Sequence, residues 1–333
     1  MSASNAMSET TEFELIERYF KPSLSRRDVA LGVGDDAAIL DVPSGCQLIV
    51  SMDTLVADVH FAADDDPRGI GHKAVAVSLS DMAAMAAEPA WATLALVLPR
   101  VDERWLAAFS EGMLGLAREF GVQLVGGDTT RGPLCITLQL HGHAPSGQAI
   151  RRSGAKVGDL VCVTGAIGDA GLALRLRQQF GRGHQGPDRE YLDRRLDRPR
   201  PRVQEGIALR GLASAVIDIS DGLSADLGHI LKASGVGAEV DVDAAPLSEA
   251  FRRCAEGMGP DEALGLVLSA GDDYELCFTL PETRVADLNV AAEAWSTPWQ
   301  VIGRITEGDD LLLVHGGGRP FTLSQNGYEH FRS

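Results

Sequence analysis

The chain has 333 residues, of which 45% are apolar, and it carries a formal net charge of −17 at pH 7. This length suits two domains or one large one, with enough apolar residues for a buried core. A surface this acidic repels polyanions, which argues against nucleic acid as a partner. No segment approaches the roughly 18 consecutive apolar residues that a membrane span requires.

The N-terminal segment and the cysteines predict a cytoplasmic protein. The first six residues, MSASNA, look like an expression remnant, so we expect Met7 to be the natural start. The glutamates that follow do not fit a secretory signal. The five cysteines are odd in number, scattered and without a C-x-x-C pair, which predicts reduced thiols rather than disulfides or a zinc site.

The N-terminal half predicts an alternation of helices and strands. The capping-box pattern Thr11-x-x-Glu14 before an apolar stretch indicates that a helix begins there. Apolar residues recur at helical spacing after Pro67, which predicts a second helix with one buried face. The other expected elements are a strand at 46–55, a strand at 91–99, a helix from Asp102 to Gly121 and a strand at 134–142.

The polar, glycine-punctuated segment 144–159 is the expected joint between two α/β domains. We expect an N-terminal domain at 7–148 and a C-terminal domain at 149–333, with residues 1–6 outside both. A mobile loop is expected at 178–190. Strands are expected near 160–164, 214–219, 237–242, 274–280, 298–305 and 310–315. Helices are expected near 170–180, 201–211, 223–234, 247–256 and 281–294.

Aspartates recur beside the predicted strands. They occur in the stretch LGVGDDAAIL, which holds Asp35 and Asp36, and in four other places, at Asp53, Asp81, Asp128 and Asp218/Asp221. Any one of them is explained as a solvated turn residue, because the short side chain of Asp bonds to nearby backbone. Asp81 differs, since it lies in an apolar helical stretch where a lone carboxylate is costly to bury.

The aspartates considered together suggest a metal site. Two carboxylates about 4 Å apart repel by roughly 4 kcal/mol at an effective dielectric constant near 20. If they converge, a cation must lie among them, and the chain has only four lysines. Mg²⁺ takes oxygen ligands and could link Asp35 or Asp36 to a nucleotide phosphate, with Gly32 and Gly34 allowing close backbone approach. The alternative, a solvated Gly-Asp turn, remains open.

The familiar nucleotide motifs are absent from this sequence. GVGDDA matches only part of G-x-G-x-x-G, and a helix precedes it where a Rossmann fold would begin with a strand. There is no G-x-x-x-x-G-K-[ST] and no set of protein-kinase loops. A nucleotide enzyme with this sequence would have to use a different fold.

Seven segments in order resemble the thiamine-monophosphate kinase family, within the superfamily of aminoimidazole ribonucleotide synthetase. They are GVGDDAA, SMDTLVADVHF, VSLSDMAAMAAEPAW, VGGDTTRGPL, RSGAKVGD, IDISDGLSADLGHI and GDDYELCF. The resemblance spans about residues 12–331. It implies a two-domain α/β fold in which a mixed N-terminal sheet forms a dimeric, barrel-like core and a C-terminal α/β domain lies outside it.

The resemblance also implies an activity. The family transfers the γ-phosphoryl group of ATP to thiamine monophosphate, forming thiamine diphosphate and ADP, with several Mg²⁺ ions in the site of a homodimer. The nucleophile is a phosphate oxygen that is already ionised at neutral pH. No strong general base is needed, and catalysis rests on positioning and charge neutralisation.

The family's site residues carry over to matching positions. Catalytic roles fall on Asp53, Asp81 and Asp128. The implied metal ligands are Asp36, Ser51, Met52 through its backbone oxygen, Asp53, Asp81, Asp128, Asp218 and Asp221. The implied ATP contacts are Gly127, Asp128, Arg152 and Ser220. The implied substrate contacts are His60, Asp272 and Tyr328.

Three positions depart from the family pattern. Met52 stands where members often have Thr, so a hydroxyl ligand is lost there although the carbonyl remains. Asp272 replaces the usual Glu and is one methylene shorter. The segment around Gly168-Asp169 is one residue shorter than the usual turn, which leaves its role open.

Two other functions compete with this interpretation. One is a sibling enzyme of the superfamily, such as selenophosphate synthetase or aminoimidazole ribonucleotide synthetase. The first of these would carry a reactive Cys with a nearby Lys close to the N-terminus, whereas the first cysteine here is Cys46 with no Lys near it. The other is a non-catalytic protein that binds a cation or senses a metabolite with the same acids.

Overall fold

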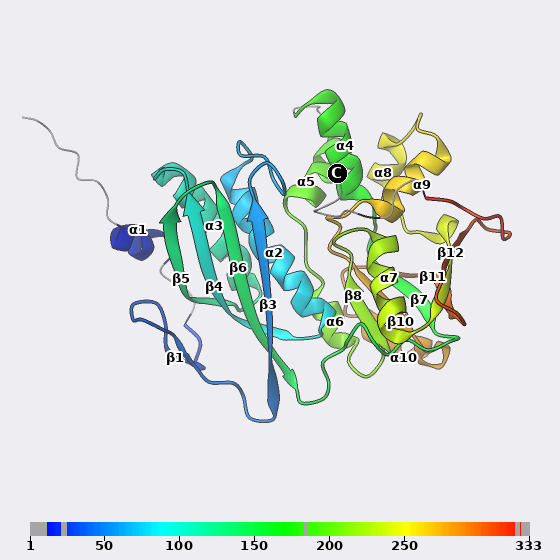
Figure 1. Cartoon of the computed structure of the whole chain (residues 1–333), viewed down its shortest axis with the longest axis horizontal. Coiled ribbons are helices and arrows are strands. Elements are labelled where there is room, and N and C mark those ends of the chain that lie inside the picture. The colour runs from blue at the N-terminus through cyan, green and yellow to red at the C-terminus, as the bar shows by residue number, and fades with distance from the viewer. Residues whose placement is uncertain (1–11, 21–24, 183–185, 324–326, 328–333) are drawn as a thin grey trace, which may run out of the picture. The chain divides into compact units, whose positions relative to one another are not determined.

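The computed structural model describes residues 12–20, 25–182, 186–323 and 327 (Figure 1). It divides into two compact units, one formed by 1–43, 52–75 and 90–141 and the other by 44–51, 76–89 and 142–333. The units are discontinuous in sequence because several strands and one helix pass from one unit to the other.

The N-terminal half contains three helices and six strands in its described residues. In chain order they are α1 (Glu12–Tyr19), β1 (Val29–Leu31), β2 (Ile39–Leu40), β3 (Cys46–Val56), α2 (Pro67–Ala84), β4 (Glu88–Leu98), α3 (Glu103–Glu119), β5 (Gln123–Arg131) and β6 (Cys135–Pro145). The cap predicted for the third helix is confirmed, since the carboxylate of Asp102 accepts hydrogen bonds from the backbone N–H groups of Arg104 and Trp105.

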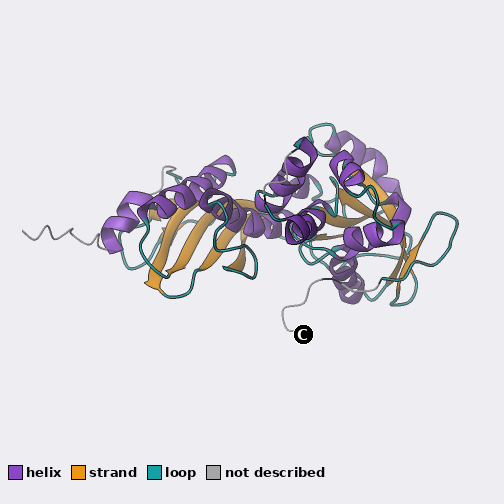
Figure 2. Cartoon of the chain, turned by 90° about the horizontal axis from the view of Figure 1, so that it is seen from above, coloured by secondary structure: helices purple, strands orange, loops and turns teal. Residues whose placement is uncertain are grey.

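Four of these strands form an open sheet in the order β3-β6-β4-β5. The helices α2 and α3 lie across one face of it (Figures 1 and 2). β4 and β5 run parallel, whereas a two-stranded antiparallel pair, β1-β2, stands apart. The sheet is mixed, as predicted. It is open within one chain, so a barrel would need strands from a second chain.

The C-terminal half builds a six-stranded mixed sheet in the order β12-β9-β11-β7-β10-β8. Its strands are β7 (Leu160–Thr164), β8 (Ala215–Asp218), β9 (Gly237–Asp241), β10 (Leu276–Leu280), β11 (Trp299–Thr306) and β12 (Leu311–Val314). Its helices are α4 (Asp169–Phe180), α5 (Pro187–Asp197), α6 (Val203–Ala208), α7 (Leu223–Ser234), η1 (Val242–Ala244), α8 (Glu249–Cys254), α9 (Pro260–Ser269), η2 (Glu282–Arg284) and α10 (Val285–Ala292).

This sheet is covered on both faces, because every residue of β7 and β10 is buried. Since β10 runs antiparallel to both β7 and β8, the carboxyl ends of β7 and β8 meet the start of β10 at one edge. Leu276 pairs with Asp218 there. The loops at this edge carry several of the predicted site residues.

The structure differs from the sequence-based expectations in three places. Helix α2 is buried on nearly all sides rather than on one face. The helices α5 and α9 and most of strand β5 were not expected. The loop expected at 178–190 is shorter, because α4 continues to Phe180 and α5 begins at Pro187. In the described part of the chain, no helix is long and apolar enough to cross a membrane.

Candidate active site

Helix α2 carries the predicted acid Asp81, and the preceding residue, Ser80, holds a second predicted acid, Asp218. Asp81 accepts a short hydrogen bond from the hydroxyl of Ser51, which lies on β3. The hydroxyl of Ser80 donates to Asp218 Oδ2 at 2.8 Å, and Asp218 ends β8. Residues separated by 30 and 138 positions in sequence are thus gathered at one end of α2.

The carboxyl of Asp81 lies in an environment that disfavours its charge. Burial raises its pKa, while the hydroxyl of Ser51 and the positive charge of Arg152 offset only part of that effect. A buried carboxylate of this kind gains from a nearby cation. Arg152 is exposed and is the cation whose charge acts on Asp81.

The turn that follows β8 is held by a residue that the sequence analysis did not single out. Asp226 Oδ2 accepts hydrogen bonds from the backbone N–H groups of Ser220, Asp221 and Gly222, at 3.0, 3.1 and 3.1 Å. Burial and the neighbouring charge of Asp221 raise the pKa of Asp226 to about 7, although these bonds act in the opposite direction. The positions of Ser220 and Asp221 therefore depend on Asp226.

Asp272 lies in a strained turn that is fastened to the same loop. Its φ is 68° and that of Tyr274 is 50°, both in the left-handed region that costs non-glycine residues about 1–2 kcal/mol each. The backbone N–H groups of Asp272 and Tyr274 donate to the carbonyls of Ser220 and Ile219. The hydroxyl of Tyr274 donates to Asp272 Oδ1 at 2.8 Å, which fixes the carboxylate beside Ser220.

The four-stranded sheet places the remaining predicted acids apart. Asp53 is on β3 and Asp128 is on β5, and these are the two edge strands of the sheet. Three interstrand spacings of about 4.8 Å put the two edges about 14 Å apart. The sheet of a single chain therefore does not bring Asp53 and Asp128 together.

Gly127, next to Asp128, is required by the packing of β5 against β4. Its φ is 157°, and a Cβ at this position would overlap the carbonyl oxygen of Leu94. Both Gly127 and Asp128 are exposed, so this bare stretch of backbone is accessible to a ligand.

His60 follows β3 and is oriented by the backbone. Its Nδ1 accepts a hydrogen bond from the N–H of Val56 at 3.0 Å, so the ring carries its proton on Nε2. A cation that the sequence analysis did not single out, Lys73, lies beside His60. Lys73 is only 4% exposed, and its Nζ lies 3.4 Å from the carbonyl oxygen of His60. Lys73 lies thirteen residues after His60, on a helix, and no local sequence motif links the two residues.

The Gly-Asp turn that contains Asp36 is exposed. The backbone N–H of Asp36 donates a hydrogen bond to Asp35 Oδ1 at 2.8 Å, and Gly34 has a φ of 126°. Met52 is 63% exposed on β3. Asp169, whose role was left open, is buried and accepts a hydrogen bond from the hydroxyl of Ser248. Tyr328 lies outside the described residues.

The described residues contain no preformed metal cage. Among them, no group of three or more His, Cys, Asp or Glu side chains could by itself hold a metal ion. The structure brings together Ser51, Asp81 and Arg152, and separately Ser80 with Asp218. It leaves Asp36, Asp53 and Asp128 on exposed or half-buried positions of the first unit.

Comparison with known proteins places the chain in a family. The family models "AIR synthase related protein, N-terminal domain" and "AIR synthase related protein, C-terminal domain" match residues 34–144 and 156–315. The thiamine-monophosphate kinase of Salmonella typhimurium is 50% identical over 321 residues, which cover 96% of this chain and 98% of the relative. The chain belongs to the thiamine-monophosphate kinase family.

Solved structures of thiamine-monophosphate kinases share the fold over nearly the whole chain. The enzyme from Stenotrophomonas maltophilia K279a is 46% identical with a TM-score of 0.85, covering 93% of this chain and 98% of that one. The structure of AaThiL complexed with AMPPCP and TMP is 29% identical with a TM-score of 0.76, covering 99% and 100%. The resemblance read from the seven motifs is confirmed.

Proposed function

We propose that this protein transfers the γ-phosphoryl group of ATP to thiamine monophosphate and releases thiamine diphosphate and ADP. The observation that carries the proposal is the convergence at the end of α2, where Ser51, Asp81 and Arg152 meet and Ser80 holds Asp218. The AaThiL relative, solved with AMPPCP and TMP, supports the choice of both substrates.

The residues divide between nucleotide and acceptor. Gly127 and Ser220 would approach ATP with backbone and hydroxyl groups, and the planar guanidinium of Arg152 suits a phosphate. The Nε2–H of His60 would donate to the phosphate of thiamine monophosphate, and the nearby Lys73 would add positive charge. Asp272, fixed by Tyr274, and Tyr328 would contact the thiamine end.

The donor set fits Mg²⁺. Its proposed members present oxygen atoms only, and the raised pKa of Asp81 is what a cation in the neighbourhood would relieve. The proposed ligands are Asp36, Ser51, the backbone oxygen of Met52, Asp53, Asp81, Asp128, Asp218 and Asp221. When bound, Mg²⁺ would neutralise phosphate charge. Because no preformed cage exists among the described residues, the phosphates would have to complete its coordination.

The chain's own residues would do the rest by positioning. A phosphate oxygen of the acceptor attacks the γ-phosphorus, and the bond from that phosphorus to the bridging oxygen of ADP breaks. Arg152 and His60 hold the two polyanions in line against their repulsion. No residue needs to remove a proton, because the attacking oxygen is ionised at neutral pH.

We also propose a homodimer. The apolar side chains of Leu48, Val50 and Met52 project along one side of β3 and are 47%, 48% and 63% exposed. An apolar row on the edge strand of an open sheet is a surface that a second copy would cover. Sedimentation velocity would report a mass near twice 35.3 kDa, and a monomer at micromolar concentration would contradict the proposal.

The domain boundary and the location complete the proposal. A boundary near residue 148 agrees with the gap between the two family-model regions, which end at 144 and begin at 156. The five cysteines are all free, which supports a cytoplasmic location.

Asp81→Asn tests the function, because it removes charge at nearly constant volume. We expect ADP formation from ATP, Mg²⁺ and thiamine monophosphate to fall by about 100-fold or more. The matched control, Asp309→Asn, removes one exposed carboxylate elsewhere and should retain wild-type turnover. Thermal unfolding of both variants checks the fold. Activity of Asp81→Asn within a few-fold of wild type would contradict the assigned role.

The two competing functions are separated by choice of acceptor and by single-turnover kinetics. Turnover with an aminoimidazole ribonucleotide precursor but not with thiamine monophosphate would indicate a sibling enzyme. Retention of labelled ATP without ADP formation in a single-turnover incubation would indicate a binding protein.

A further inference from the structure

The turn that carries Asp272 needs support from outside itself. Asp272 and Tyr274 both have a left-handed backbone, with φ of 68° and 50°. Residues other than glycine keep this conformation only where the surrounding structure enforces it. The backbone bonds to Ile219 and Ser220 hold one side of the turn. A second support comes from Glu275, the residue that follows Tyr274.

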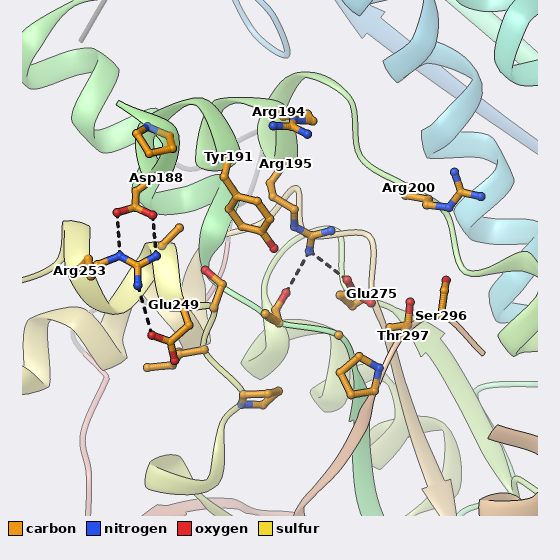
Figure 3. Close-up of a pocket in the computed structure, with 18 of the residues that line it drawn as sticks. Asp188, Tyr191, Arg194, Arg195, Arg200, Glu249, Arg253, Glu275, Ser296 and Thr297 are labelled. Carbon is orange, nitrogen blue, oxygen red and sulfur yellow. Dashed lines mark hydrogen bonds and ion pairs between the residues drawn. The ribbon is translucent and has the colours of Figure 1, made fainter. Parts of the chain in front are cut away.

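Glu275 anchors the turn through a buried carboxylate. Its side chain is fully buried, and it accepts two hydrogen bonds from Arg202, at 2.6 and 2.5 Å. Arg195 donates a third at 2.9 Å, in the wall of the cavity that Figure 3 shows. The hydroxyl of Thr164 donates a fourth at 2.8 Å. A Cβ on Gly165 would overlap the carboxylate, so a side chain at that position would displace it.

Arg202 connects this carboxylate to helix α2. It immediately precedes α6 and is 8% exposed. Further along α6, a Cβ on Gly206 would overlap the carbonyl oxygen of Ala83, so the two helix backbones are in direct contact. Ala83 lies two residues after Asp81 on α2, and all of these residues belong to one compact unit. Contacts therefore run from the end of α2, through Arg202, to the turn of Asp272.

Arg202 bonds Glu275 alone, whereas Arg195 is shared among several partners. Every side-chain hydrogen bond that Arg202 makes within the described part of the chain goes to Glu275. Arg195 also donates to the carbonyl of Ala166 at 3.0 Å and forms an ion pair with Asp169 at 3.4 Å. A bidentate guanidinium fixes the orientation of a carboxylate as well as balancing its charge. Arg202 is therefore the group that sets the direction of the Glu275 carboxylate.

We propose that Arg202 is a positioning residue for thiamine monophosphate, which acts through Glu275 and the turn of Asp272. This inference rests on the proposed function, in which Asp272 contacts the thiamine end. The nucleotide side of the site has its own support, because Asp226 holds the turn that carries Ser220. A change at Arg202 should therefore weaken the use of the acceptor and spare the use of ATP.

Arg202→Lys is the test, with steady-state kinetics of ADP formation by the full chain. Lysine keeps the positive charge but lacks the planar fork that holds both carboxylate oxygens. We expect KM for thiamine monophosphate to rise by at least about 10-fold, while KM for ATP stays within about 2-fold of wild type. A role in stability alone would not separate the two KM values.

Arg177→Lys is the matched control. Arg177 makes the same bidentate contact, with Asp197, at 2.7 and 2.5 Å, and its side chain is 13% exposed against 9% for Arg202. Its hydrogen bonds join α4 to α5. Both KM values should stay at wild type in this variant, although thermal unfolding should show that both substitutions lower stability.

Two further variants test whether the effect passes through Glu275 and Asp272. Thr164→Val removes the hydroxyl bond to Glu275 at nearly constant volume. It should raise KM for thiamine monophosphate by about 5-fold, again with little change for ATP. Asp272→Gly removes the acceptor contact and suits the left-handed backbone. Adding Arg202→Lys to it should change KM for thiamine monophosphate by less than about 2-fold, because the group that Arg202 positions is already gone.

The outcomes separate this inference from the proposed function. Absence of ADP formation with thiamine monophosphate in the wild type would overturn the proposed function, and this inference with it. With an active wild type, the inference alone is overturned if Arg202→Lys keeps both KM values or raises them equally. An equal rise in Arg177→Lys, or an undiminished effect of Arg202→Lys in Asp272→Gly, also overturns it.

Discussion

Asp226 holds the turn that carries Ser220 and Asp221 through one carboxylate oxygen. It is 2% exposed, and the three N–H groups that it bonds lie in the turn just before α7, which begins at Leu223 after its N-cap Gly222. Without that oxygen, the three N–H groups of this partly buried turn would lose the hydrogen bond that it accepts from each of them, which is costly. Asp226 is thus a positioning residue for the proposed nucleotide contact.

Asp226→Ala should therefore impair ATP use more than thiamine monophosphate use. We expect kcat/KM for ATP to fall by about 10- to 100-fold and the free energy of unfolding to fall by about 2–4 kcal/mol. Asp226→Asn keeps an acceptor oxygen and should recover most of both quantities. Steady-state kinetics with each substrate varied in turn, together with urea unfolding, make the measurement. Equal losses for the two substrates would show that Asp226 acts on stability alone.

The residues of the candidate site were largely predictable one by one, whereas their partners were not. The motifs gave the positions of Ser51, Asp81 and Asp218 because each motif is local in sequence. The contacts of Ser80 with Asp218 and of Ser51 with Asp81 join residues 138 and 30 positions apart. No spacing rule on a single sequence encodes such pairs, since they arise only when separate elements pack.

Helices α2 and α3 cross at two glycines. A Cβ at Gly71 would overlap the carbonyl oxygen of Phe109, and a Cβ at Gly112 would overlap that of Arg68. The contact is reciprocal, so the two backbones approach each other more closely than any side chain allows. Gly115, one turn further along α3, has no atom within 4 Å of its Cβ position.

Gly71→Ala should destabilise the protein, because one helix must move away from the other or distort. We expect a loss of about 2–4 kcal/mol in the free energy of unfolding, similar to other overpacked or strained core changes. Gly115→Ala is the matched control and should be neutral or stabilising by up to about 1 kcal/mol, since Ala favours the helix. Denaturant unfolding of both variants measures the change in the free energy of unfolding. A neutral Gly71→Ala would mean that the helices are free to separate.

The elements that the sequence predicted well carry their own local signals. Strand β3 and helices α3 and α7 have clear periodicity, caps or glycine ends. The prediction that helix α2 has a single buried face was wrong, because its small residues let it pack on nearly all sides. Helix α5 has few apolar residues, and its helical state is fixed by ion pairs to α4 such as Arg177 with Asp193 and Asp197. That support is tertiary and leaves no periodic pattern.

At the scale of the whole chain, a buried charge cluster links the stability of the C-terminal unit to pH. It contains three carboxyl groups, Asp169, Asp273 and Glu275, and two guanidinium groups, Arg195 and Arg202. The acids outnumber the bases, so the cluster favours one protonated carboxyl. Burial raises the pKa of Asp273 well above 3.8, and its Oδ1 has no hydrogen-bond partner among the described residues.

Asp273→Asn should stabilise the protein at neutral and alkaline pH. The folded pKa of Asp273 is raised, so its contribution to wild-type stability is full below its unfolded pKa near 4 and is lost as pH rises through the folded pKa. Asn carries no charge, and its carbonyl oxygen can still accept the bond that Gly168 donates at 2.7 Å.

The stability difference between Asp273→Asn and the wild type should therefore grow as pH rises above the unfolded pKa near 4, and it is compared at pH 5 and pH 8. While Asp273 stays protonated in the folded protein and ionised in the unfolded chain, each step of one in pH adds about 1.4 kcal/mol to this difference. Urea unfolding at both pH values measures it, with Asp309→Asn as the exposed-site control that should show no such trend. A difference that stays constant with pH would mean that Asp273 is ionised in the folded protein. Arg195 would then neutralise it, and the proton of the cluster would have to reside on Asp169, whose pKa burial also raises.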